Sequence, residues 1–107
     1  MESDDTTQAL SIARDLGVPY ASRENKILVA QKNQGLADLI PEDFAVSHAV
    51  FPLFLDGNTL AVAMARPDDA LALERMRLIT RCEIQPFVAR RDELMRAISG
   101  FYRTRPG

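Results

Sequence analysis

Residues 40–80, IPEDFAVSHAVFPLFLDGNTLAVAMARPDDALALERMRLIT, contain the pattern that decides the fold. Two apolar runs, Val50–Leu55 and Thr59–Ala65, are separated by Asp56-Gly57-Asn58, a turn in which glycine adopts positive φ at low cost. This pattern predicts a β-hairpin. Pro67-Asp68-Asp69 then predicts the first turn of a helix, because proline fits there and carboxylates favour the positive end of the helix dipole.

The second run of the hairpin alternates large and small apolar residues: Leu60, Val62 and Met64 against Ala61, Ala63 and Ala65. Since successive strand residues point to opposite faces, this strand is predicted to be covered on both faces. Proline removes a ladder donor, so Pro52 and Pro86 place the first strand, and a third strand over Cys82–Ala89, at sheet edges.

Helices are predicted on both sides of this unit. The first begins at Asp5 or Thr6, ends at Gly17, and buries Ala9, Ile12, Ala13 and Leu16. Two short helices follow at residues 33–40 and 41–49, after a stretch at 21–32 that is irregular or briefly extended. The helix after Pro67 buries Ala72, Leu73, Met76 and Ile79, and the last, from Arg91, buries Leu94, Ala97, Ile98 and Phe101.

The predicted fold class is therefore α+β: N-terminal helices followed by a β-β-α-β-α unit, with a small three-stranded mixed sheet packed by helices. The 107 residues suffice for one domain. We expect a disordered N-terminus at 1–6, the domain at 7–102, and a tail or the start of a linker at 103–107.

Charge is distributed unevenly. Residues 1–65 carry four Lys/Arg and nine Asp/Glu, a net of −5, whereas residues 66–107 carry nine Arg and six Asp/Glu, a net of +3. The overall charge of −2 does not indicate nucleic-acid binding. The arginine-rich half can attract an anionic ligand or an acidic partner, although a solvated face with ion pairs is the commoner explanation.

Motifs for catalysis or metal binding are absent from the sequence. It contains neither G-x-x-x-x-G-K-[ST] nor G-x-G-x-x-G. A lone Cys82 and a lone His48 make a poor zinc site; they leave a nucleophile pair as one alternative, against a buried cysteine and a packed histidine. The carboxylate pairs Glu42-Asp43 and Asp68-Asp69 each follow a proline, as expected at helix starts. We therefore predict no enzyme, no metal and no cofactor.

The single cysteine, the polar start MESDDTTQ and the lack of a long apolar run predict a cytoplasmic protein without direct membrane insertion. Any position at a membrane is expected to come through a partner.

The ordered set of motifs resembles the N-terminal domain of the bacterial assembly ATPases of type II secretion and type IV pilus systems. The matching stretches are ALSIARDLGVPY (9–20), LIPEDFA (39–45), VFPL (50–53), LAVAMARPDD (60–69), LxxMRxxT (73–80), IxPFVA (84–89) and RDELMRAISGFY (91–102).

The resemblance implies a non-catalytic protein-interaction or regulatory domain for protein transport, which docks a motor onto a membrane-platform or signalling partner. The surface expected to bind that protein partner is rich in arginine: Arg75, Arg77, Arg81, Arg91 and Arg96. An alternative is a sensor of cyclic di-GMP or another phosphate ligand, as in some pilus ATPases.

Two departures from the family bear on these expectations. Arg14-Asp15-Leu16-Gly17 only partly matches the R-L-G motif of the cyclic di-GMP subtype, and no second copy of the motif follows. Cyclic di-GMP is therefore not the expected ligand. Arg81 stands where the family has glycine after the middle helix. Because a left-handed conformation strains arginine, either the helix ends differently or Arg81 makes a contact.

Overall fold

The computed structural model describes residues 2–22, 24–28 and 36–103. In chain order the elements are α1 (Glu2–Leu16), α2 (Leu36–Leu39), α3 (Glu42–His48), β1 (Val50–Asp56), β2 (Thr59–Met64), α4 (Ala70–Thr80), β3 (Glu83–Val88) and α5 (Arg91–Arg103). The predicted α+β class and the β-β-α-β-α order are confirmed.

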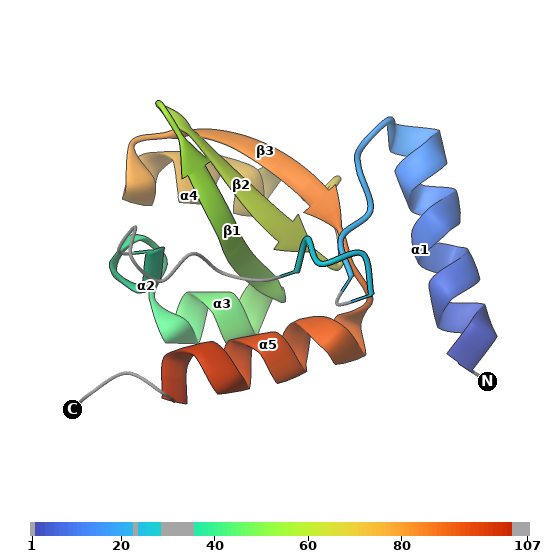
Figure 1. The fold of residues 1–107 in the computed structure, drawn as a ribbon. Coiled ribbons are helices and arrows are strands. Elements are labelled where there is room, and N and C mark those ends of the chain that lie inside the picture. Colours follow the sequence, from blue (N-terminus) through green and yellow to red (C-terminus); the bar gives the residue numbers. More distant parts are fainter. Residues whose placement is uncertain (1, 23, 29–35, 104–107) are drawn as a thin grey trace.

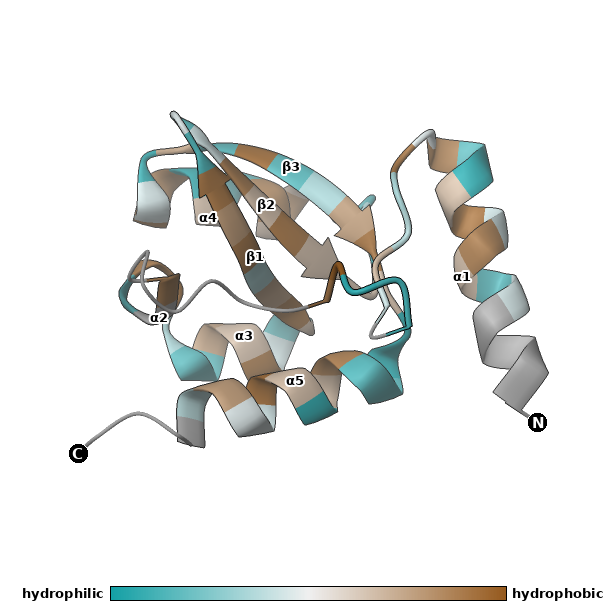
Figure 2. Cartoon of the chain, viewed as in Figure 1, coloured by the Kyte–Doolittle hydropathy of each residue, from teal (hydrophilic) through white to brown (hydrophobic). Residues whose placement is uncertain are grey.

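The sheet has the strand order β1-β2-β3, with β1 antiparallel and β3 parallel to β2. The mixed sheet therefore has β2 at its centre, and Pro52 and Pro86 stand on edge strands as predicted. Leu60 to Met64 of β2 are all buried, which confirms a strand covered on both faces. Figure 2 shows mainly hydrophobic residues along β1 and β2.

The hairpin closes with a two-residue loop, because Asp56 pairs with Thr59. Gly57 has a φ of 60°, as hairpin turns with glycine in the first loop position require. The register shifts between Pro52 and Phe54, so Leu53 is an extra residue in β1. The apolar pattern did not predict this bulge, which leaves Leu53 fully buried.

The helices cover the sheet from different directions. Figure 1 shows α4 behind the strands, and α3 and α5 below them, where these two helices contact each other. In α5, Leu94, Ile98, Phe101 and Tyr102 are buried, and the ring of Phe101 meets Phe51 of β1 at a centroid distance of 5.4 Å. The predicted core stripe of α5 is thus confirmed, with Ala97 packed partly against the core.

Helix α4 begins later than predicted. The backbone N–H of Asp69 donates to the Arg66 carbonyl at 3.1 Å, so Pro67 lies in a turn and not in the helix. Asp69 is the N-cap, and its Oδ1 accepts a hydrogen bond of 3.2 Å from the N–H of Ala72. A side-chain cap of this kind fixes the start of a helix more strongly than proline does.

The buried stripe of α4 also differs from the prediction, and Leu73 is only half-buried. Ala72, Met76 and Thr80 are buried at spacings of four, whereas Ile79, predicted to be buried, is 46% exposed. Thr80 tolerates burial because its hydroxyl donates to the Met76 carbonyl at 2.7 Å.

Helix α1 begins at Glu2, before the predicted cap at Asp5 or Thr6, and ends at Gly17, whose φ is 68°. The N–H of Val18 donates to the Ala13 carbonyl at 3.0 Å, which completes a Schellman motif. Leu16 is 43% exposed and not buried as predicted, because α1 stands to one side of the domain and packs mainly on β3 (Figure 1).

Residues after α1 extend the sheet by one bridge. The N–H of Val88 donates to the Pro19 carbonyl, and the N–H of Ala21 donates to the Val88 carbonyl, both at 2.8 Å. A turn held by Ser22 and Asn25 follows, and Leu28 is buried. The rest of the predicted irregular stretch, and the start of the helix predicted at 33–40, lie outside the described residues, as does 104–107. The domain boundaries stay predictions.

Arg81 ends α4 in the left-handed conformation, with φ 60° and ψ 29°, and its N–H donates to the Arg77 carbonyl at 2.8 Å. The helix therefore ends as a glycine-capped helix does, and the expectation of a different ending is wrong.

We predict that Arg81→Gly stabilises the domain by about 1 kcal/mol, since glycine avoids the left-handed penalty. Arg81→Ala is the matched control: it removes the same side chain but keeps the Cβ atom, so it should give no gain. Urea unfolding measures both variants. Equal stability of the two would show that the left-handed conformation carries no penalty here.

Tyr102 ties the last helix to the first half of the chain: its hydroxyl donates to the Ile40 carbonyl at 2.6 Å, and both groups are buried. Tyr102→Phe is expected to lower the free energy of unfolding by about 1–3 kcal/mol, because it leaves a buried carbonyl without this donor. The same urea measurement tests it, with the exposed Ser99→Ala on α5 as control. An unchanged midpoint would contradict the assignment.

Candidate functional site

The five arginines predicted to bind a partner are all exposed, and they form two groups. Arg75 and Arg77 lie on α4 and Arg81 caps it, whereas Arg91 and Arg96 lie on α5. Because α4 lies behind the strands and α5 below them in Figure 1, we treat the groups as separate surfaces. Arg77 makes an ion pair of 3.8 Å with Glu83, but both side chains are well exposed, so this pair contributes little to stability.

Two leucines occupy the solvent side of α4. Leu71 is 59% and Leu78 is 71% exposed. The two leucines are seven positions apart, which is about two helical turns, so they lie on the same side of the helix. This side is opposite the buried stripe of Ala72, Met76 and Thr80. Glu74 and Arg75 lie between the leucines on this side, and we call these four residues the α4 outer face. Arg77, Ile79 and Arg81 flank it.

Sequence reasoning identified the arginines of α4 and missed its leucines. The stretch ALALERMRLIT carries apolar residues on every side of the helix, so its pattern does not distinguish a buried from an exposed leucine. The outer side of α5 differs, since its exposed residues are Arg91, Arg96, Ser99 and Gly100. The α4 outer face therefore combines exposed apolar side chains with adjacent positive charge, and such a combination suits a protein partner.

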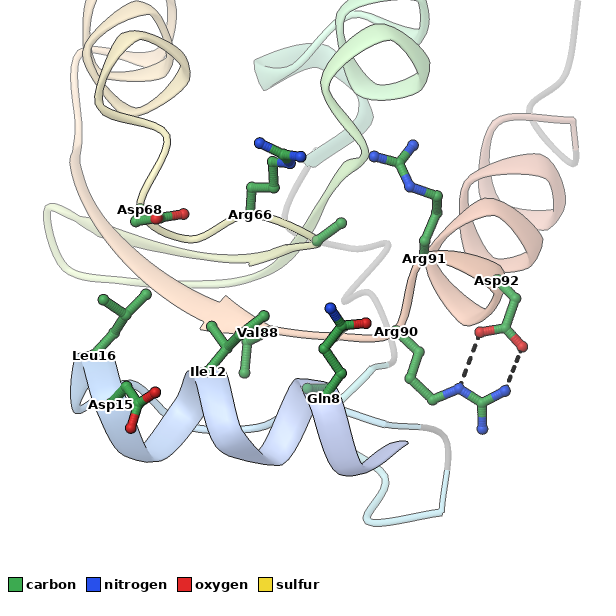
Figure 3. Close-up of a pocket in the computed structure, with 13 residues that line it drawn as sticks. Gln8, Ile12, Asp15, Leu16, Arg66, Asp68, Val88, Arg90, Arg91 and Asp92 are labelled. Atoms are coloured by element: carbon green, nitrogen blue, oxygen red, sulfur yellow. Dashed lines mark hydrogen bonds and ion pairs between the residues drawn. The ribbon is translucent and has the colours of Figure 1, made fainter. Parts of the chain in front are cut away.

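A pocket of about 700 Å³ lies elsewhere, between α1, the end of β2, the end of β3 and the start of α5 (Figure 3). Ala9, Ile12, Leu16 and Val88 give it an apolar wall. Charged residues complete the lining: Asp15, Arg66, Asp68, Arg90, Arg91 and Asp92. The sequence did not predict this pocket, because its walls come from segments up to 84 positions apart, from Gln8 to Asp92.

Arg90 and Asp92 form a bidentate ion pair in this lining, with Nε–Oδ1 at 3.0 Å and Nη2–Oδ2 at 2.6 Å. Partial burial alone would raise the pKa of Asp92. The hydrogen bonds and charge of Arg90, with backbone N–H groups at the start of α5, outweigh that effect and hold the pKa below its ordinary value of 3.8. The pair fixes the start of α5, which positions Arg91.

The alternative of a nucleophile pair is not supported by the geometry. Glu83, next to Cys82, pairs with Thr59 at the hairpin end of the sheet, whereas Val50, next to the His48 helix, pairs with Met64 at the opposite end. Cys82 Sγ instead contacts the Thr80 carbonyl at 3.4 Å, and the ring of His48 packs on Phe44 at 4.3 Å. Both residues are accounted for by structural contacts.

Within residues 2–22, 24–28 and 36–103, no group of three or more His, Cys, Asp or Glu side chains is placed to hold a metal ion. Over the same residues, no helix is both long and apolar enough to cross a bilayer.

Residues 16–107 match the family of the MshEN domain. The chain belongs to this family. An MshEN domain is the N-terminal domain of type II secretion and type IV pilus ATPases, which confirms the resemblance seen in the sequence. The match includes the α4 outer face and all of the pocket except its α1 residues before Leu16.

A curated relative of this MshEN chain is the type IV pilus assembly ATPase PilB of Thermus thermophilus, which is 33% identical over 99 residues. The similarity covers 88% of the chain and only 11% of PilB. The activity of that much longer protein cannot be carried over to these 107 residues.

Two solved structures share the fold of this MshEN chain. The structure of MshE with cdg gives a TM-score of 0.78 at 20% identity, and covers 91% of this chain and 68% of that one. The structure of the N-terminal domain of XpsE gives 0.77 at 20% identity, and covers 89% and 64%. At this identity the likeness shows the fold alone.

In this MshEN chain, the residues that partly resemble the R-L-G motif form the last turn of α1. Arg14 is exposed, and Gly17 supplies the left-handed residue that ends the helix. The Schellman motif at Gly17 is thus a sufficient structural explanation for the glycine.

Arg90→Gln is expected to raise the pKa of Asp92, because it removes the cation that opposes the effect of burial. A carboxyl NMR titration of the wild type and the variant measures this shift. An unchanged Asp92 titration would show that the ion pair does not persist in solution.

The same pair makes stability depend on pH. Since the pKa of Asp92 is lowered on folding, its contribution is complete above the ordinary value of 3.8 and is lost as pH falls through the folded value. Asp92→Asn should therefore destabilise the domain near neutral pH and flatten the acid limb of its stability profile. An Asn variant with an acid limb as steep as that of the wild type would contradict this.

Proposed function

We propose that this domain is a non-catalytic docking and regulatory module of a type II secretion or type IV pilus ATPase, and that the α4 outer face binds a protein partner. The observation that carries the proposal is the exposure of Leu71 and Leu78 on one side of a helix whose opposite side is fully packed. We place the partner among the membrane-platform or signalling components of the same system, on the cytoplasmic side.

The chemistry of the α4 outer face supports a partner with an apolar patch and an acidic rim. Full burial of two leucines contributes about 1.5–3 kcal/mol each. Arg75, Arg77 and Arg81 outnumber Glu74 and Glu83, so the surroundings of the leucines carry a net positive charge. Such a charge favours encounter with an acidic surface and excludes basic ones.

A docking role requires no activated side chain. Cys82 and His48 lie toward opposite ends of the sheet, and the described residues bring together no metal-binding cluster. The Asp92 carboxyl, which has a lowered pKa, is held in an ion pair with Arg90 and is not poised for proton transfer. A module of this kind would regulate the ATPase motor by fixing the position of the motor at the membrane platform.

Binding of cyclic di-GMP is the second candidate, because the structure of MshE with cdg shares this fold. The partial motif in α1 weighs against it, since Gly17 is needed to end the helix. An amide NMR titration with cyclic di-GMP tests it: saturable shifts would support a sensor, and an unchanged spectrum would exclude this ligand.

The docking proposal is tested by titrating the domain with the cytoplasmic fragment of the platform protein from the same secretion or pilus system. We expect shifts over residues 70–81 and a dissociation constant about tenfold or more weaker in Leu78→Ser and in Arg75→Glu. Both positions are exposed, so neither variant should lose its fold.

The matched control is Arg96→Glu on α5, which reverses an exposed charge on the other predicted arginine surface. It should bind as the wild type does. If Arg96→Glu abolished binding while the α4 variants retained it, the docking surface would be α5, and the assignment to the α4 outer face would be wrong.

A further inference from the structure

The pocket between α1 and the sheet is separate from the α4 outer face, so the proposed docking role does not account for it. Its volume of about 700 Å³ lies within the range of about 300–1,000 Å³ typical of small-molecule sites. The pocket lies at the carboxyl ends of the parallel strands β2 and β3. Met64 and Val88, the last residues of these strands, pair with each other there. Ligands of sheets with parallel strands commonly bind at the carboxyl ends of those strands.

Two arginines stand at this edge without a partner. Arg66 follows β2 and Arg91 begins α5, and neither makes an ion pair or a side-chain hydrogen bond within the described part of the chain. Figure 3 shows their guanidinium groups pointing toward one another. Two guanidinium groups that converge in this way present several N–H donors to one oxyanion.

The backbone that carries these arginines is fixed on both sides. The N–H of Ala65 donates to the Ala49 carbonyl at 3.1 Å, and the N–H of Ala89 donates to the Met64 carbonyl at 3.0 Å. Beyond them, the Asp69 N–H to Arg66 carbonyl bond and the Arg90–Asp92 ion pair hold the two loops. The site is thus largely preformed, which lowers the entropy lost on binding.

The opposite end of the pocket has the opposite charge. Figure 3 shows Asp15 and Leu16 of α1 at this end, while Ile12 and Val88 lie between them and the arginines; Asp68 lies beside Arg66. The Arg90 guanidinium does not alter this polarity, because Asp92 neutralises it. A ligand anionic at both ends would place its second anionic group near the Asp15 carboxylate, whereas one anionic at a single end would not.

We propose that this pocket binds a small organic molecule with an apolar body and a single oxyanion, phosphate or carboxylate, at one end. Arg66 and Arg91 hold the oxyanion, and the apolar body lies along Ile12 and Val88 under α1. The carboxylate of Asp15 rejects a second anionic group and accepts hydrogen bonds from hydroxyl or amino groups on the far end of the body.

The test is an amide NMR titration of the domain with four probes: phenyl phosphate, benzoate, inorganic phosphate and benzyl alcohol. We expect saturable shifts at residues 8–16, 65–68 and 88–92 with phenyl phosphate or benzoate. Inorganic phosphate has the oxyanion without the apolar body, and benzyl alcohol has the apolar body without the oxyanion. Each should bind about tenfold or more weakly than the better of the first two probes. Whichever of the first two binds more tightly identifies the oxyanion as phosphate or carboxylate.

Charge-matched variants separate the pocket from general electrostatics. Arg66→Gln/Arg91→Gln should weaken phenyl phosphate and benzoate about tenfold or more, because the charge-assisted hydrogen bonds are lost. Arg75→Gln/Arg77→Gln removes the same charge from α4 and should leave the affinity unchanged. All four positions are exposed, so the variants should keep the fold of the wild type.

The proposal is overturned if no probe saturates, if the shifts lie outside these segments, or if both double variants weaken binding equally. It is independent of the docking proposal, since Leu78→Ser and Arg75→Glu should not alter these titrations. If the two α4 variants lose platform binding but still bind the probes, the two sites are separate. If the wild type binds the platform fragment but none of the probes, only the pocket proposal is wrong.

Discussion

The central strand β2 is the constraint on which the rest of the structure depends. It forms hydrogen bonds with β1 and β3 on its two edges, and its residues from Leu60 to Met64 are buried on both faces. A buried strand must have every backbone group paired and every side chain covered. Parallel pairing of β3 also requires a crossover connection, which α4 supplies, so α4 lies against the sheet because of how β3 pairs with β2.

Much of the fold could be predicted because its signals are local. The hairpin follows from Gly57 between two apolar runs, and the edge strands follow from Pro52 and Pro86. The errors arose where tertiary contacts or side-chain caps decide the outcome: Asp69 moved the start of α4, Leu53 entered as a bulge, and Thr80 replaced Ile79 in the core. A helix with apolar residues all round gives no local signal for its buried side.

The two proposed sites were less accessible to sequence reasoning than the fold. Arginine density indicated α4 and α5, but exposure of Leu71 and Leu78 depends on how α4 packs. Gln8 and Asp92 both line the pocket although they are far apart in the sequence, and no local pattern predicts that they lie close together. The two sites also differ in origin, since one is a helix side that the core does not cover and the other is the edge where parallel strands end.

The hydrogen bond between Tyr102 and Ile40 spans 62 positions and joins the last helix to the segment before the hairpin. Because β3 and α5 pack on earlier strands, the contacts of the complete sheet and of the last helix can form only when the C-terminal part of the domain exists. On the ribosome, the nascent chain would therefore remain largely unfolded until α5 has left the exit tunnel.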